Sequence, residues 1–219
     1  QPPTPERVKY DIFDRVNRGG TPLNKQEMRN ALYRGRCTRM LDKLCCSPEF
    51  LIATGRSINK ERMKDQYVVL RAIAFLMLHR GEFKDIPALQ YRGDIDDFLA
   101  RFMVYVNDNA PEKLIVDYEN LFIRCMQISY DLLGENGFRF SGNGIRRPIN
   151  MPLFEALSYL FSFVPEKIDY TWASRLILDI ESVKEEFDDS RYFSGNIDST
   201  TSVSFRFDRM DKIINRIQL

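Results

Sequence analysis

The chain has 219 residues, 44% of them hydrophobic and 29% charged, so its composition excludes wholesale disorder. Its 32 basic and 31 acidic residues give a net charge of +1, which excludes a strongly basic surface over the whole protein. The charge is nevertheless unevenly placed. Residues 28–64 hold nine basic and three acidic side chains, a net +6, whereas residues 65–219 sum to −6.

The four cysteines and the single histidine do not follow the spacing of a metal site. Cys45 and Cys46 are adjacent, no two cysteines are separated by two residues, and His79 has no neighbouring set of ligands. We therefore expect reduced thiols packed in a core and a cytoplasmic location, with disulfides as the alternative. No run of about 18 apolar residues predicts a membrane span, and the first residues do not resemble a signal peptide.

Residues that start and stop helices divide the chain into amphipathic segments. Thr4-Pro5 begins the first predicted helix, and Gly19-Gly20 ends it. Asn24 and Glu27 have the spacing of a capping box for the next helix, which ends at Gly35. The other predicted helices span residues 38–44, 47–55, 60–79, 94–106, 111–133, 150–163, 170–187 and 202–217.

One of these helices has the pattern of a central element. The segment over 60–79 is apolar on most sides from Val68 to Leu78, so we expect other helices to surround it. Asn109 is a candidate N-cap for the helix over 111–133. Since no strand alternation is visible, the sequence predicts an all-α fold of about eight to ten helices. Since no fixed repeat or linker is visible either, we expect these helices to form one domain over residues 1–219.

The segment over residues 13–29 is the most distinctive part of the sequence. Phe13 and Asn17 are one helical turn apart and share a face, so the amide can hydrogen-bond a base or a phosphate while the ring packs beneath it. Gly19 and Gly20 allow a close approach of the backbone to a ligand. These four residues are our candidate nucleotide site. The alternative is that Asn17 and the two glycines only end a helix.

Four segments, in order along the chain, resemble the GmrSD-type restriction family. Residues 13–29, FDRVNRGGTPLNKQEMR, are similar to its pattern F-x-R-I-N-T-G-G-x-P-L-N-x-Q-E-I-R. Residues 58–75 resemble its R-M-x-D segment and the L-R-F-x-A-F that follows. Residues 147–155 resemble K-P-I-N-x-A-L-F-E, and residues 199–207 resemble S-G-T-x-S-x-x-V-x-x-R-F. The resemblance therefore covers nearly the whole chain.

This resemblance implies the helical C-terminal region of a ParB/sulfiredoxin-like protein of bacterial defence, directed at foreign or modified DNA. In that family a D-G-Q-Q-R motif linked to nucleotide hydrolysis precedes this region, and many members carry a later HNH-type nuclease domain. This sequence holds neither. The resemblance implies that residues 1–35 complete an N-terminal ParB-like domain or subunit that is absent here. The complete protein would be an NTP-dependent DNA endonuclease using Mg²⁺, and this chain would hold no catalytic residue or cofactor.

Two groups of arginines are candidate contacts to the phosphates of DNA. Guanidinium groups without interleaved aromatic residues suit backbone contact better than base recognition. The alternative is a solvated helix face, or arginines paired with acids of another domain. The groups are Arg29, Arg34, Arg36 and Arg39, and, in a glycine-containing loop, Arg146 and Arg147.

The sequence leaves three functions open. The first is the helical domain that frames a nucleotide or DNA site in a defence protein. The second is a standalone interaction or regulatory module without catalysis, with homo-oligomerisation left open. The third is an unrecognised helical hydrolase, for which no nucleophile and base arrangement stands out. The sequence encoded upstream of Gln1 would separate the first two.

Overall fold

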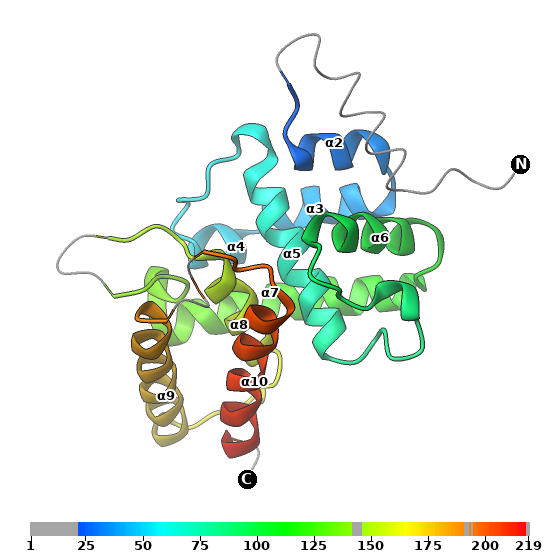
Figure 1. Ribbon diagram of the computed structural model, residues 1–219. Coiled ribbons are helices and arrows are strands. Elements are labelled where there is room, and N and C mark those ends of the chain that lie inside the picture. The colour runs from blue at the N-terminus through cyan, green and yellow to red at the C-terminus, as the bar shows by residue number, and fades with distance from the viewer. Residues whose placement is uncertain (1–21, 142–145, 191–192, 194, 218–219) are drawn as a thin grey trace, which may run out of the picture.

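The computed structural model describes residues 22–141, 146–190, 193 and 195–217 (Figure 1). Within these ranges the chain forms nine α-helices and three short 3₁₀ helices, with no strand, packed as one compact domain. This confirms the predicted all-α fold. The first predicted helix, with the candidate nucleotide-site residues Phe13, Asn17, Gly19 and Gly20, lies outside the described residues.

The helices lie close to their predicted bounds. The α-helices are α2 (Lys25–Leu32), α3 (Arg36–Cys45), α4 (Pro48–Ala53), α5 (Lys64–His79), α6 (Ile95–Asp108), α7 (Glu112–Leu133), α8 (Met151–Phe161), α9 (Tyr170–Asp188) and α10 (Thr200–Ile217). The 3₁₀ helices are η2 (Glu61–Met63), η3 (Pro87–Leu89) and η4 (Gly134–Asn136).

Side-chain caps explain where most of the helices begin. Asn24 Oδ1 accepts hydrogen bonds from the backbone N–H groups of Gln26 at 2.8 Å and Glu27 at 2.9 Å, and Glu27 Oε2 accepts one from the Asn24 N–H at 2.6 Å. This is the predicted capping box. The prediction that Asn109 caps α7 is wrong. Its N–H continues α6 by donating to Tyr105 O at 2.9 Å, so Asn109 ends that helix.

The start of α5 differs from the prediction by one helical turn. Arg62 and Met63 adopt left-handed backbone conformations, with φ of 56° and 58°, so α5 begins at Lys64 instead of near Lys60. Non-glycine residues rarely occupy this region, and each such residue costs about 1–2 kcal/mol. Surrounding contacts must therefore hold the two residues in place. The Arg62 guanidinium is held by Pro22 O at 2.5 Å and by the Glu27 carboxylate at 2.9 Å.

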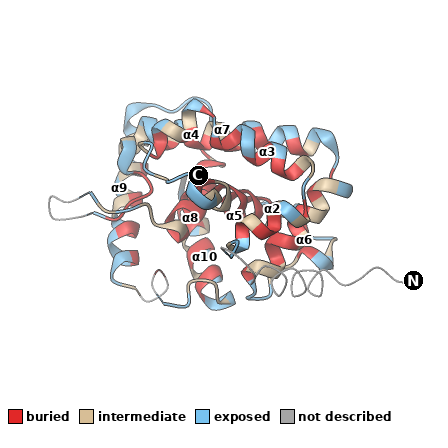
Figure 2. Ribbon diagram, turned by 90° about the horizontal axis from the view of Figure 1, so that it is seen from above, coloured by how far each residue is buried: buried red, intermediate tan, exposed pale blue. Residues whose placement is uncertain are grey.

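The core surrounds α5, as its continuous apolar pattern predicted. Its residues Val69, Leu70 and 72–76 are fully buried, and α8 and α3 pack along it. Helix α8 also packs against α10, and α4 packs against α7. Figure 2 shows buried residues turned towards the centre of the domain and exposed residues on its outside.

A network of buried charges joins three of these helices. Glu155 of α8 accepts hydrogen bonds from Arg71 of α5 and, at 3.0 Å, from Arg206 of α10, and all three side chains are at most 1% exposed. Arg71 also donates to Asp198 Oδ1 at 2.6 Å and to the hydroxyl of Tyr67 at 3.0 Å. Arg71, Glu155 and Arg206 come from three of the segments that resemble the restriction family. Their contacts give those positions a structural role here.

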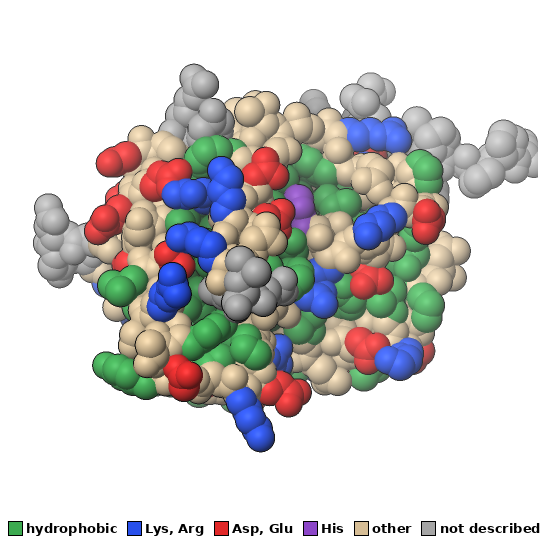
Figure 3. Space-filling view, turned by 90° about the horizontal axis from the view of Figure 1, so that it is seen from below, with side chains coloured by type: hydrophobic (Ala, Val, Ile, Leu, Met, Phe, Trp, Pro, Cys, Tyr) green, Lys and Arg blue, Asp and Glu red, His purple; other side chains and the backbone are tan. Residues whose placement is uncertain are grey.

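The surface carries charges of both signs. On the face shown in Figure 3, basic and acidic side chains are interspersed, so that face has no field of one sign. No helix in the described part of the chain has both the length and the apolarity to cross a membrane. All four cysteines are free thiols. Cys37, Cys45 and Cys125 are buried as expected, but Cys46 is exposed, because it ends α3 on the outer side.

Candidate functional site

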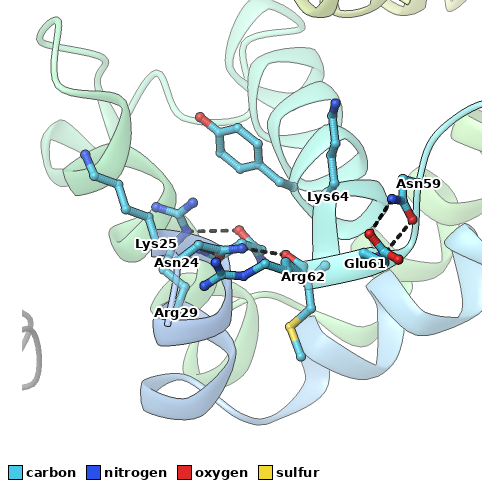
Figure 4. A pocket seen from close by; sticks show the side chains of 10 residues that line it. Asn24, Lys25, Arg29, Asn59, Glu61, Arg62 and Lys64 are labelled. Atoms are coloured by element: carbon cyan, nitrogen blue, oxygen red, sulfur yellow. Dashed lines mark hydrogen bonds between the residues drawn. The ribbon is translucent and has the colours of Figure 1, made fainter. Parts of the chain in front are cut away.

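A pocket of about 490 Å³ lies between the start of α2 and the start of α5 (Figure 4). We call it the α2–α5 pocket. Figure 4 shows Lys25, Arg29 and Arg62 towards one side of it, and Lys64, Asn59 and Glu61 towards the other. The residues that line it are Asn24, Lys25, Gln26, Arg29, Asn59, Glu61, Arg62, Met63, Lys64 and Tyr67.

Hydrogen bonds between α2 and η2 fix the floor of the pocket. The Asn24 side chain, besides capping α2, donates from Nδ2 to Arg62 O at 2.7 Å. The Arg62 guanidinium donates a hydrogen bond to the Glu27 carboxylate on α2. This bond and the one from the Asn24 N–H both lower the pKa of the Glu27 carboxyl. The left-handed residues at the start of α5 thus place the Arg62 backbone against the α2 cap. Asn24 therefore belongs both to the capping box and to the lining of the pocket.

Asp96, at the start of α6, organises the basic side of the pocket. Its carboxylate accepts hydrogen bonds from the Lys25 ammonium and, at 2.8 Å, from Arg29 Nη1. Burial disfavours the charged form of Asp96, but these two cations outweigh burial and lower its pKa. One carboxylate therefore holds two cations side by side.

Arg29 has a hydrogen-bonding group that no described residue satisfies. Its side chain is fully buried, Nε donates to Gln26 Oε1 at 3.0 Å, and its Cζ lies 5.3 Å from the centre of the Tyr67 ring. Its second terminal nitrogen, Nη2, is buried without a hydrogen-bond partner. An unsatisfied buried donor on a charged group costs about 1–3 kcal/mol or more, so an acceptor oxygen in the pocket would be stabilising.

Lys64 supplies a cation on the opposite wall. Its side chain is exposed and makes no hydrogen bond or ion pair with a residue that the structure describes. Beside it, Asn59 and Glu61 hydrogen-bond each other at 2.8 Å through both side-chain and backbone groups. A ligand in the pocket would therefore lie between Arg29 on one side and an unpaired ammonium on the other.

The predicted group of four arginines does not form one basic face. Arg29 is buried in the α2–α5 pocket and is not at the surface. Arg36 is partly buried and donates to the Glu112 carboxylate at 2.9 Å. Arg34 and Arg39 are exposed to solvent, so contact of these two with DNA stays a prediction.

The second predicted group lies elsewhere. Arg146 donates to the Glu135 carboxylate at 2.7 Å, and Arg147 pairs with Asp188 at the end of α9. Both arginines line a separate cavity together with Lys64. The structure therefore brings the loop arginines close to the start of α5, a proximity that the sequence did not indicate.

Sequence reasoning missed most of the residues that line the α2–α5 pocket. Lys25, Arg62, Lys64 and Tyr67 were not candidates, although Arg62 and Lys64 were counted in the basic segment. The pocket depends on the turn at Arg62 and Met63, and nothing in the local residue types predicts two left-handed residues there.

The arrangement of cations and the unpartnered Arg29 Nη2 suits binding of an anion. The described lining residues include no nucleophile placed beside a base, and no group of three or more His, Cys, Asp or Glu side chains in the described ranges could hold a metal ion. Comparison of the chain with protein-family models, curated proteins and solved structures returned no match. The class of ligand is therefore inferred from the geometry and charge of the pocket.

Proposed function

We propose that this chain is the helical domain of a bacterial restriction or antiviral defence protein, and that its α2–α5 pocket holds the phosphate groups of a nucleotide. The observation that carries the proposal is Arg29 Nη2, a buried guanidinium nitrogen without a partner, next to the cations Lys25, Arg62 and Lys64. Guanidinium groups form strong charge-assisted hydrogen bonds with phosphate oxygens, as they do with carboxylates. A volume of about 490 Å³ is within the range of pockets for ligands of nucleotide size.

The position of the pocket in the sequence also supports this proposal. Asn24, Gln26 and Arg29 belong to the segment over residues 13–29 that resembles the GmrSD-type family. The candidate residues Phe13, Asn17, Gly19 and Gly20 precede α2 in the same segment, although they lie outside the described residues. We propose that they contribute to the same nucleotide site.

The remaining parts of the proposal rest on the resemblance. The catalytic groups would belong to a ParB-like domain or subunit that closes over the pocket, in a cytoplasmic NTP-dependent enzyme acting on DNA with Mg²⁺. Arg34 and Arg39, which are exposed, would contact the DNA backbone. This chain would bind nucleotide without hydrolysing it, so turnover of ATP or GTP by the purified chain would contradict the proposal.

Calorimetric titration with ATP and GTP, with and without Mg²⁺, tests binding. We expect saturable binding to the wild-type chain, and affinity about five- to tenfold weaker for Lys25→Gln, because one charge-assisted contact is lost. The matched control is Lys113→Gln, which removes an exposed charge that pairs with Asp117 on α7. If neither nucleotide binds at low salt, or if Lys25→Gln matches the control, the pocket is not a nucleotide site.

A second candidate function is a protein-interaction module, favoured by exposed apolar residues around α9. Tyr170 is 88% exposed and Leu178 is 72% exposed, and both belong to α9. In this alternative the chain would self-associate or bind a protein partner without needing nucleotide. Light scattering of wild type and Leu178→Asp tests the self-association part, since a dimer through α9 would be lost in the variant.

A further inference from the structure

A second cavity, of about 360 Å³, lies where the loop before α8 meets the start of α5. We call it the Arg139 pocket. Four cations line it, Lys64, Arg139, Arg146 and Arg147, and no acidic residue does. Apolar side chains complete its walls: Ile58, Val68, Ile149 and Met151. The pocket thus combines a cluster of positive charge with hydrocarbon surface.

Arg139 is the unusual member of this cluster. Its side chain is only 4% exposed, yet none of its hydrogen bonds goes to a carboxylate. Nε donates to Glu135 O at 3.1 Å, Nη2 donates to Thr54 O at 3.1 Å and to Ser57 Oγ, and Nη1 donates to Arg147 O. These bonds use four of the five N–H donors but give the charge no carboxylate partner, which is costly in a buried position.

Neighbouring charges do not correct this imbalance. Burial, and then the charge of Arg146, lower the pKa of the Arg139 guanidinium by more than the Glu135 carboxylate raises it, so its surroundings on balance disfavour the positive charge. Glu135 pairs with Arg146, and Asp188 pairs with Arg147. The four cations thus face two carboxylates, which leaves two positive charges, those of Arg139 and Lys64, without an anionic partner among the described residues.

We propose that the Arg139 pocket is a separate binding site for a small organic phosphate, a dianionic phosphate monoester attached to a compact apolar group. Two unpaired positive charges match a dianion, and the walls formed by Ile58, Val68, Ile149 and Met151 match a hydrocarbon group. Inorganic phosphate would satisfy the charge but leave these walls in contact with water.

This site is distinct from the α2–α5 pocket, although the two meet at Lys64. Lys64 lines both cavities, whereas Lys25 lines only the first and Arg146 lines only the second. A ligand in either pocket would draw the same ammonium towards itself. Occupation of the Arg139 pocket would therefore weaken nucleotide binding in the α2–α5 pocket, which makes it a candidate regulatory site.

Calorimetric titration of the wild-type chain with three probes tests the ligand class. The probes are phenyl phosphate, phenyl sulfate and inorganic phosphate at pH 8. Phenyl sulfate has the same shape as phenyl phosphate but one negative charge fewer, so we expect it to bind about fivefold more weakly or worse. Inorganic phosphate lacks the apolar ring and should bind about tenfold more weakly. Equal affinity for all three probes would overturn the proposed ligand class.

Variants locate the site and separate this inference from the proposed function. Arg146→Gln should weaken phenyl phosphate about fivefold and leave nucleotide binding unchanged, whereas Lys25→Gln should do the reverse. Glu135→Gln should strengthen phenyl phosphate, because it removes a carboxylate that competes for Arg146. A gain in affinity cannot result from misfolding. Unchanged affinity in both Arg146→Gln and Glu135→Gln would refute the site, whatever the nucleotide result.

Discussion

Replacing Glu155 with Gln tests whether the buried charge network holds the domain together. Glu155 is fully buried, and its two carboxylate oxygens accept from Arg71 and Arg206, whose side chains are at most 1% exposed. Glutamine keeps the size of the side chain but removes its charge, so Arg206 loses its only carboxylate partner among the described residues and Arg71 keeps only Asp198. Removing one partner of a buried ion pair costs about 3–5 kcal/mol, so we expect a loss of that size.

The measurement is urea unfolding followed by circular dichroism, with thermal unfolding beside it. A loss of about 3–5 kcal/mol corresponds to a fall in Tm of roughly 6–20 °C for a chain of this size. The control is Glu186→Gln, since Glu186 pairs with Arg209 at 2.5 Å on the surface. Surface pairs of this kind contribute about 1 kcal/mol or less. The reasoning is refuted if Glu155→Gln costs no more than Glu186→Gln.

A further variant separates the charge from the packing. Changing Arg71 to Met, Glu155 to Leu and Arg206 to Met together removes all three buried charges and keeps similar volumes. Apolar replacement of a complete buried ionic group is often neutral or stabilising, so the triple variant should be more stable than Glu155→Gln alone. If the triple variant is the less stable of the two, the cost of Glu155→Gln does not come from uncompensated charge.

Burial and packing lead to three other predictions. Burial, together with the charge of Arg206, lowers the pKa of His79 from 6.5 to about 3, so the unfolded chain takes up the proton first. Stability should therefore fall as pH drops below 6.5, by up to about 1.4 kcal/mol per pH unit, and His79→Phe should flatten this dependence in urea titrations at pH 4.5–7. Cys46 is the exposed thiol, so one cysteine of the native chain should react with a thiol reagent and four after unfolding. A Cβ at Gly35 would lie 2.6 Å from Asn107 Oδ1, and the Asn107 amide is held by hydrogen bonds with Cys37 N–H and Tyr33 O. Because Asn107 cannot move without losing these bonds, Gly35→Ala should cost about 1–3 kcal/mol in the same unfolding assay.

The helices could be predicted from the sequence because their signals are local. The capping box of Asn24 and Glu27 depends on residues three positions apart, and the end of α7 at Gly134 depends on one glycine. The central place of α5 was visible in its unbroken apolar run. The error at Asn109 has the same local origin, since a residue that can start one helix can also end the one before it.

The candidate sites could not be predicted in this way, because their members are distant in sequence. Lys64 was one basic residue among many until the fold placed it between Arg29 on α2 and Arg146 in the loop before α8. The basic segment over residues 28–64 indicated a binding face. Instead, the fold buries Arg29 against Asp96 and turns Arg36 towards α7.

The sequence by itself determined that this chain is a set of amphipathic helices around one apolar helix, because periodicity and capping act between neighbouring residues. Only the tertiary structure decided which charges meet. Packing brings together Arg71, Glu155 and Arg206 from three helices, and among the described residues it leaves Arg29 Nη2 and the charge of Arg139 without anionic partners. Charge compensation depends on distances through space, and the linear order of the residues does not contain those distances.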